Sequence, residues 1–202
     1  MILESIVSTV ATDGRVNLAP MGPLLSHPEA MSNAVGDPGF VLRPFEGSTT
    51  FDNLITTRRA TIHVSDDAEL FAKAAIGELT DTESRVRKTD DGDFATLLNC
   101  HRWFRVTVEE VHSTPPRFEM NCVVLESGIE KPFFGFNRAK HAVLEAAILA
   151  TRVHLLEAEE LRTQLAALES PVEKTAGPSE RTAFRLLADT IDRRIRECRG
   201  PQ

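Results

Sequence analysis

The spacing of apolar residues changes near Asn137, and this change constrains the fold more than any other feature of the chain. Before that point, β-branched runs such as 2–11 alternate with turn residues. The sequence therefore predicts a mainly β domain over residues 1–132 and a helical extension over residues 133–202. In the extension, residues recur at every third or fourth position, as on one face of a helix; these are Ala147, Ala150, His154, Ala158, Leu161, Leu165 and Leu168.

Turn chemistry organises the β part. Asp13-Gly14 lies between two extended runs, which is a strong signal for a β-hairpin. Pro20 cannot donate a hydrogen bond to a neighbouring strand, so the return strand is interrupted there or lies at an edge. Residues 80–93 are charged and lack periodicity, which predicts a surface loop. Further strands are expected at 39–42, 60–64, 101–112 and 117–125, the last two joined at Pro115-Pro116 into a long hairpin.

Two short helices are expected within the β part. Thr49 and Asp52 have the spacing of a capping box, so one helix should begin near Thr49 or Thr50. Ser65 is followed by two aspartates, which is typical of an N-cap with acids favoured by the helix dipole. That second helix should run to about Ala75.

The extension should contain two longer helices. Ser170-Pro171 and Gly177-Pro178 interrupt the first apolar stripe. A second stripe follows, made of Phe184, Leu187, Ile191 and Ile195. Two helices joined by a short break predict an antiparallel hairpin, which packs on the β domain or on a partner subunit.

Composition excludes several functions. Acidic side chains outnumber basic ones, 30 to 23 in 202 residues, so the field of the chain repels nucleic acid. No apolar run approaches the ~20 residues that span a bilayer. The 3 cysteines are widely spaced and the 6 histidines show no metal-ligand pattern, so neither a disulfide framework nor a metal site is expected. These features favour a cytoplasmic protein that binds neither nucleic acid nor membrane.

The segment from Arg43 to Asn53 carries the strongest signal for a binding site. Gly47 precedes three hydroxyl residues at the start of an expected helix. A phosphate dianion needs such an environment, with free backbone N–H groups, hydroxyl donors and a fixed positive charge. The alternative is that the hydroxyls only cap the helix and that Arg43 is a surface cation. The residues alone leave both interpretations open.

Two further segments carry weaker signals. The strand around Asn17-Leu18-Ala19-Pro20-Met21 is made irregular by proline, and its unpaired backbone groups could address a flat heterocycle; the alternative is an ordinary bulge or edge. Asn137 and Arg138 stand where a loop enters a helix, with Lys140 and His141 one turn further, and this basic cluster could hold an anion. The alternative is that Asn137 caps the helix and Arg138 pairs with an acid.

These segments together resemble a known family. Asn17-Leu18-Ala19-Pro20, the run from Arg43 to Leu54 and the strand end His63-Val64-Ser65 are similar to the flavin reductase-like, FMN-binding split barrels. The run 134–147, Phe-Gly-Phe-Asn-Arg-Ala-Lys-His-Ala-Val-Leu-Glu-Ala-Ala, and Lys174-Thr175-Ala176-Gly177 narrow the likeness. They resemble a family of uncharacterised prokaryotic proteins of this type, over nearly the whole chain.

The resemblance implies a six-stranded Greek-key split barrel with a C-terminal antiparallel helical hairpin. It also implies a homodimer with FMN in a groove at or near the subunit interface. In such barrels the segment after the third strand holds the phosphate and an early strand lies along the flavin ring. The implied phosphate residues are Arg43, Ser48, Thr49, Thr50 and Asn53, the implied ring residues are Asn17, Ala19, Pro20 and Met21, and Asn137 and Arg138 are further cofactor candidates.

The function expected from this resemblance is an FMN-dependent oxidoreductase acting on an unidentified small molecule, with NADH or NADPH as the electron donor. No catalytic residue is assigned, because the flavin ring itself carries hydride chemistry. The alternative is a non-catalytic flavin-binding or carrier protein whose helical hairpin mediates oligomerisation or partner binding. Trp103 is expected in the barrel core or an interface, and His63 is expected to point away from the core.

Overall fold

The computed structural model describes residues 1–26, 39–114 and 117–199, which form two compact units. The sheet unit comprises Met1–Ser65 and Asp81–Phe133, and the helical unit comprises Asp66–Thr80 and Phe134–Gln202. The predicted division at residues 132 and 133 keeps the segment Asp66–Thr80 with the β part. In the structure the helix of that segment packs on the helices of the extension instead.

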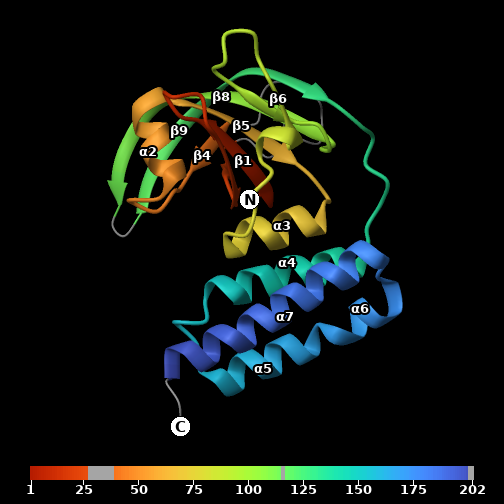
Figure 1. Ribbon diagram of the computed structural model, residues 1–202. Helices are drawn as coiled ribbons and strands as arrows, with labels where there is room; N and C mark the ends of the chain where they lie inside the picture. The colour runs from red at the N-terminus through yellow and green to blue at the C-terminus, as the bar shows by residue number, and fades with distance from the viewer. Residues whose placement is uncertain (27–38, 115–116, 200–202) are drawn as a thin grey trace. The chain divides into compact units, whose positions relative to one another are not determined.

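The sheet unit is built on one antiparallel sheet of seven strands in the order β2-β1-β5-β8-β9-β4-β3. The sheet is strongly curled (Figure 1). It contains one strand more than the six expected, because the two-residue strand β3 extends one edge. The strands are β1 (Ser5–Val10), β2 (Val16–Met21), β3 (Leu24–Leu25), β4 (Phe40–Leu42), β5 (Arg59–Val64), β8 (Arg102–Thr114) and β9 (Arg117–Ile129).

The hairpin of β1 and β2 forms where the sequence predicts it. Gly14 has a φ of 83°, and its N–H donates to the carbonyl of Ala11 at 2.8 Å. A positive φ is a conformation that glycine adopts without a steric cost, which explains the Asp-Gly turn. Because β2 ends the strand order, Pro20 lies on an edge strand, where its missing N–H costs no ladder hydrogen bond.

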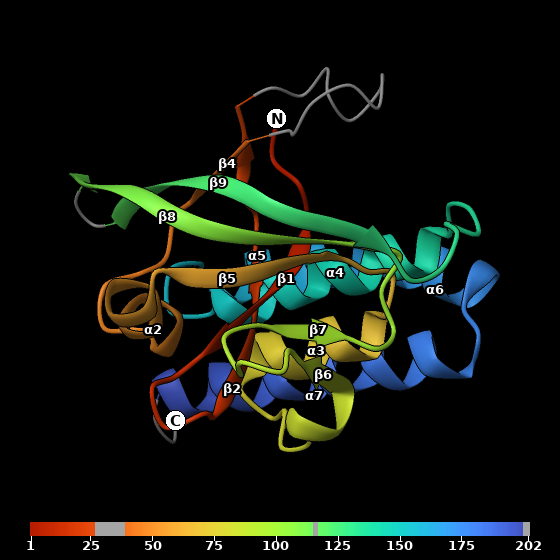
Figure 2. The same cartoon turned by 90° about the horizontal axis from the view of Figure 1, so that it is seen from above.

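Strands β8 and β9 form the longest hairpin of the sheet unit (Figure 2). Both strands are longer than predicted, at 13 residues each. Their register shifts between Arg105 and Val106 and again between Val108 and Glu110. Such irregularities increase local twist and help a sheet to curl. The predicted turn at Pro115-Pro116 lies outside the described residues.

The concave side of the sheet encloses an apolar core. Val7, Ile62 and Phe104 come from three adjacent strands and are fully buried. Phe40 packs edge-on against Phe104, with ring centroids 5.0 Å apart. Helix α2 (Thr49–Thr57) adds the fully buried Leu54. Each such side chain contributes about 1.5–3 kcal/mol by leaving water, so this core stabilises the curled sheet that positions α2.

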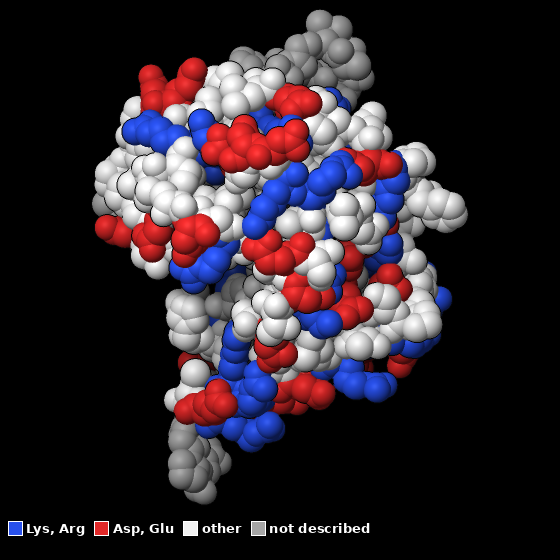
Figure 3. All heavy atoms as spheres, turned by 45° about the horizontal axis from the view of Figure 1, so that its top comes forward, with Lys and Arg blue, Asp and Glu red and all other residues white. Residues whose placement is uncertain are grey.

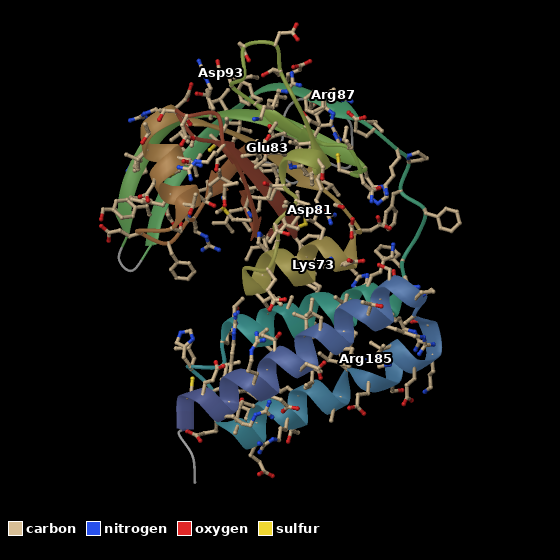
Figure 4. The ribbon with its side chains drawn as sticks, in the orientation of Figure 1. Lys73, Asp81, Glu83, Arg87, Asp93 and Arg185 are labelled. Carbon is tan, nitrogen blue, oxygen red and sulfur yellow. The ribbon has the colours of Figure 1, made fainter. Side chains whose placement is uncertain are left out.

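The segment predicted as a charged surface loop is ordered, and that prediction is wrong. Residues 80–93 contain the 3-10 helix η1 (Glu83–Arg85) and strand β6 (Val86–Lys88), which pairs with β7 (Ala95–Leu97) just after the segment. Figure 4 shows Glu83, Arg87 and Asp93 along this segment. The sequence does not reveal β6 because this charged strand is exposed or half-buried and so lacks the apolar pattern of a buried strand. Of this small sheet, only the three residues of β7 are buried.

His63 is completely buried, although the sequence predicts only that it points away from the core. Its side chain does leave the apolar core, but β7 covers the sheet at this place. The Leu97 N–H donates to His63 Nε2 at 3.1 Å, and Nδ1 lies 2.9 Å from the Ile6 carbonyl oxygen. This pattern requires a neutral ring with its proton on Nδ1. Burial lowers the pKa of His63 from 6.5 to about 4.

In its described residues the helical unit contains five helices, four of which belong to the extension, where the sequence predicts a hairpin of two. They are α3 (Ala68–Ile76), α4 (Arg138–Thr151), α5 (Ala158–Ala167), α6 (Glu169–Thr175) and α7 (Pro178–Arg199). The predicted long helix is wrong because the chain leaves helical geometry between Thr151 and Ala158. Val153 and Leu161 still pack into one apolar cluster with α4 and α7, so the apolar spacing continues across the break.

Individual residues explain how the helices end and meet. His154 lies exposed in the break after α4, whereas the sequence placed it in a packed stripe. Pro171 lies near the start of α6, where a missing N–H is tolerated. The predicted stripe on α7 is confirmed, since Leu187, Ile191 and Ile195 are buried.

None of the helices in the described ranges is long and apolar enough to cross a membrane.

We predict that protonation of His63 destabilises the protein in acid. Its folded-state pKa lies below its unfolded-state value, so the unfolded chain takes up the proton first. The free energy of unfolding should therefore fall as the pH drops from about 6.5 to about 4, by at most about 1.4 kcal/mol per pH unit from this group. Urea unfolding at several pH values measures this slope.

The matched variants are His63→Gln and His154→Gln. Glutamine at position 63 cannot take up the proton, so this variant should be less stable at neutral pH but less sensitive to acid. The exposed His154 should leave the slope unchanged when it is replaced. An equally steep slope in His63→Gln would contradict the assignment.

Candidate functional site

The first turn of α2 is capped by Ser48. The Ser48 hydroxyl accepts a hydrogen bond from the Phe51 N–H at 3.2 Å and donates to the Phe45 carbonyl at 2.7 Å. Gly47, with a φ of 76°, brings the chain into the cap. The hydroxyl of Ser48 is thus occupied within the protein, which matches the capping interpretation for this one residue.

Donors remain at the same helix end after the cap has formed. The N–H groups of Thr49 and Thr50 have no acceptor among the described residues, because the first N–H groups of a helix lack intrahelical partners. The Thr49 side chain is exposed, and that of Thr50 is buried. The Nε atom of Arg43 is also buried and unpaired within the described part of the chain. An acceptor with several oxygens at this helix end would satisfy both N–H groups.

A pair of side-chain hydrogen bonds joins α2 to the first hairpin. Asn17 Nδ2 donates to Thr50 Oγ1 at 2.9 Å, and Asn53 Nδ2 donates to Thr9 Oγ1 at 2.9 Å. Because Thr50 Oγ1 accepts from Asn17, its own proton stays available for another acceptor. The structure thus brings two of the predicted segments together. Thr9 was missed by the sequence analysis, although counting back from the Asp13-Gly14 turn places it opposite Asn17.

The remaining ring candidates lie along the edge strand β2. Ala19 and Met21 follow Asn17 at intervals of two residues, so their side chains share one face of the strand. Pro20 points to the opposite face. All three residues are half-buried. Since β1 alone among the described strands pairs with β2, one row of the backbone groups of β2 faces away from the sheet and can meet a ligand.

Asn137 and Arg138 belong to the helical unit. Asn137 caps α4 by accepting hydrogen bonds from the N–H groups of Ala139 and Lys140, and its amide donates to the carbonyl of Thr175. Arg138 is exposed in the first turn of the helix. The cap explains Asn137 fully, and a cofactor role for either residue stays a prediction.

Other reactive groups of the sheet unit are held in inert forms. Burial raises the pKa of Cys100 to about 11 and that of Cys122 to about 12, so both are neutral thiols at pH 7. Trp103 is buried, as predicted, and its indole N–H donates to Glu130. A Cβ at Gly128 would come within 2.5 Å of the Trp103 ring, so the glycine makes room for it.

The charge distribution agrees with the sequence analysis. Figure 3 shows acidic and basic side chains interspersed over the visible face, without one continuous basic surface. The net charge of the chain is -7. A binding site for an anion must therefore work through local donors, because the overall field of the protein repels negative charge.

Comparison with known proteins shows which family the chain resembles. Two domain models described as protein of unknown function (DUF447) match it: the N-terminal domain over residues 3–131 and a second domain over residues 137–189. The crystal structure of an FMN-bound protein from Methanosarcina mazei, assigned to the same family, is also similar. It shares 26% sequence identity and a TM-score of 0.78, over 94% of each chain.

More distant similarities concern the fold. An FMN-binding protein from Thermus thermophilus, with bound 1-cyclohex-2-enone, is 15% identical with a TM-score of 0.50, over 64% of this chain and 72% of that chain. Flavoredoxin from Methanosarcina acetivorans is 11% identical with a TM-score of 0.50, over 65% and 74% of the two chains. These likenesses confirm the predicted flavin reductase-like split-barrel fold.

We predict that Ser48 stabilises the protein through its cap. Ser48→Ala removes the acceptor for the Phe51 N–H and should lower the free energy of unfolding by about 1 kcal/mol. Ser48→Asn keeps a capping oxygen and should lie within a few tenths of a kcal/mol of the wild type. Urea unfolding compares the three proteins; equal stability of Ser48→Ala and the wild type would contradict the capping role.

Proposed function

Since the chain belongs to the DUF447 family, we propose that it is an FMN-binding flavoprotein that transfers hydride or electrons between its flavin and a small molecule. The observation that carries this proposal is the set of unused donors at the start of α2. The FMN-bound relative from Methanosarcina mazei supports the choice of cofactor.

The hydrogen-bond donors at the N-terminus of α2 suit the phosphate of FMN. Two unpaired N–H groups, from Thr49 and Thr50, lie at the positive end of a helix dipole, and the Thr49 and Thr50 hydroxyls can add hydrogen bonds. Arg43 supplies a positive charge that is always present, and its buried Nε needs an acceptor. Asn53 supports the site indirectly, because its amide ties α2 to β1.

The flavin ring would lie along β2. The hydrogen bond between Asn17 and Thr50 connects this strand to the phosphate site, so one extended ligand can contact both. Ala19 is small enough for close approach, and Met21 offers a polarisable thioether to an aromatic ring. Backbone groups on the free side of β2 can address the polar edge of the ring.

Bound FMN supplies the hydride and electron chemistry, and the protein's part is to bind and orient it. We propose NADH or NADPH as the electron donor. The buried thiols of Cys100 and Cys122 are protonated at neutral pH and take no part as nucleophiles. The side chains of Asn17 and Thr50 can form hydrogen bonds but do not serve as acids or bases for proton transfer.

One observation favours a second function, that of a non-catalytic flavin carrier. None of the side chains proposed to face the ring, Asn17, Ala19 and Met21, can donate or accept a proton near neutral pH. A flavin held only by such residues could be stored or delivered without reacting. Reduction by a nicotinamide nucleotide distinguishes the two functions.

We predict that Arg43 and the α2 N-terminus together discriminate FMN from riboflavin. Riboflavin lacks the phosphate, so the wild type should bind FMN at least tenfold more tightly. Arg43→Gln should weaken FMN binding about tenfold or more, since charge-assisted hydrogen bonds contribute about 1.5–3 kcal/mol each. The same substitution should hardly change riboflavin binding. Quenching of flavin fluorescence gives both affinities.

Arg15→Gln is the matched control, because Arg15 is an exposed arginine of the β1–β2 turn. It removes the same charge from the sheet unit and should leave both affinities unchanged. Equal affinity of the wild-type protein for FMN and riboflavin would rule out a phosphate site, whatever the effect of Arg43→Gln.

We also predict that the FMN-loaded protein is reduced by NADH or NADPH. Loss of the visible absorbance of the flavin under nitrogen would measure this reduction. Bound flavin that keeps its absorbance with both nucleotides, while dithionite still reduces it, would support the carrier function instead.

A further inference from the structure

The backbone groups of β2 alternate between the two sides of the strand. The Ala11 N–H donates to the Arg15 carbonyl at 2.9 Å, so the carbonyl of Arg15 faces the β1 side of the hairpin. Asn17, Ala19 and Met21 follow at intervals of two and lie opposite residues of β1. Because hydrogen-bonded pairs alternate with non-bonded pairs along an antiparallel ladder, the backbone N–H and C=O groups of these three residues also face β1.

The residues between them direct their backbone groups to the free side of β2. These residues are Val16, Leu18 and Pro20. Each has a carbonyl oxygen on this side, but their N–H groups differ. Pro20 has no N–H, and the Val16 N–H donates to Glu83 Oε1 at 3.1 Å. Among the described residues, the free side of β2 thus offers three carbonyl oxygens and a single unused N–H, that of Leu18.

Glu83 is held in place by a second partner. It belongs to η1 and is labelled in Figure 4. Its Oε2 atom lies 2.8 Å from Lys88 Nζ, and Lys88 also donates to the Gly14 carbonyl at 2.7 Å. The hydrogen bonds from Lys88 and from Val16 lower the pKa of Glu83 from its ordinary value of 4.5. The carboxylate is therefore ionised at neutral pH and can only accept hydrogen bonds, which keeps the Val16 N–H occupied.

The two redox states of FMN differ in the donors along the polar edge of the ring. The oxidised ring has an N–H only at N3, and its N1, N5 and carbonyl oxygens are acceptors. Reduction adds two electrons and two protons, and N–H bonds form at N1 and N5. A protein carbonyl that faces an N–H gains a hydrogen bond, whereas one that faces a lone pair leaves two acceptors unsatisfied. Hydrogen bonds to the ring nitrogens are thus one means by which a protein tunes a flavin.

We infer that the free edge of β2 makes this protein bind reduced FMN more tightly than oxidised FMN. Pro20 and Glu83 produce this preference by withholding N–H donors from the edge, and Glu83 does so through Val16, as a positioning residue. The inference rests on the proposed flavin function and deepens it, because it states which redox state the site favours. Tighter binding of the reduced form means that the protein keeps its flavin after reduction rather than releasing reduced FMN.

Binding measured in both redox states tests this preference. Ultrafiltration of the full chain with FMN, once in air and once under nitrogen with dithionite, gives the concentration of free flavin in each state. Dithionite supplies the two electrons by its own oxidation, and a mildly acidic buffer supplies the two protons. We expect the reduced form to bind at least tenfold more tightly. A tenfold difference corresponds to a midpoint potential about 30 mV more positive for bound than for free FMN, which a reductive titration checks independently.

Pro20→Ala returns an N–H to the free side of β2. Alanine is compatible with an edge strand, so the sheet unit should stay folded. The preference for reduced FMN should fall at least threefold, because the oxidised ring gains a donor. Pro178→Ala is the matched control, since Pro178 is the exposed first residue of α7 in the helical unit. It should leave both affinities unchanged.

Glu83→Ala and Glu83→Gln separate the hydrogen bond from the charge. Both substitutions remove the negative charge beside Lys88, but only glutamine keeps an oxygen that can accept from the Val16 N–H. The preference for reduced FMN should therefore be at least threefold smaller in Glu83→Ala than in Glu83→Gln. Equal preferences in these two variants would contradict the role of Glu83.

Failure of this inference differs from failure of the proposed function. A wild-type chain that binds both redox states within threefold of each other would overturn the inference and leave FMN binding in place. A Pro20→Ala variant that keeps the full wild-type preference would also overturn it. A chain that binds neither form would overturn the proposed function and the inference together. A tenfold preference that falls in both Pro20→Ala and Glu83→Ala would support the inference.

Discussion

The hydrogen bond from Asn17 to Thr50 is the interaction on which the proposed site depends. It joins the edge strand β2 to the first turn of α2, two segments separated by 33 residues in the sequence. Because Asn53 of α2 also donates a hydrogen bond to Thr9 on the neighbouring strand β1, the helix end is fixed to both strands of the first hairpin. Without this attachment, the free donors of α2 and the open edge of β2 would be two unrelated features; with it, they are joined in one surface, which we propose as the binding site.

The cap of α2 illustrates how one segment can serve both stability and binding. Ser48 uses its hydroxyl inside the protein, whereas the N–H groups of the next two residues have no acceptor among the described residues. Sequence reasoning treats helix capping and phosphate binding as alternatives. The structure separates them by residue: Ser48 forms the cap, whereas Thr49, Thr50 and Arg43 retain unused donors. A buried arginine Nε without a partner costs free energy, and a bound phosphate would offset that cost.

The sequence predicts six strands of the large sheet, the first hairpin and the start of α2 because glycine, proline and hydroxyl residues have specific local preferences. Prediction from the sequence fails where the burial of a residue depends on a segment that is distant in the chain. His63 is buried because β7 crosses the sheet, and the charges around β6 hide that strand. The break after Thr151 is also invisible, since two helices that face one core keep the same apolar spacing as a single helix.

The backbone amides of Thr49 and Thr50 test the central claim most directly. In ¹⁵N-labelled protein, FMN should shift both amide resonances strongly and slow their hydrogen exchange, because each N–H gains a charged acceptor. Riboflavin should produce much smaller changes at these two residues. If the protein binds FMN, by its absorbance spectrum, while both amides keep their free-state shifts and exchange rates, then α2 does not hold the phosphate.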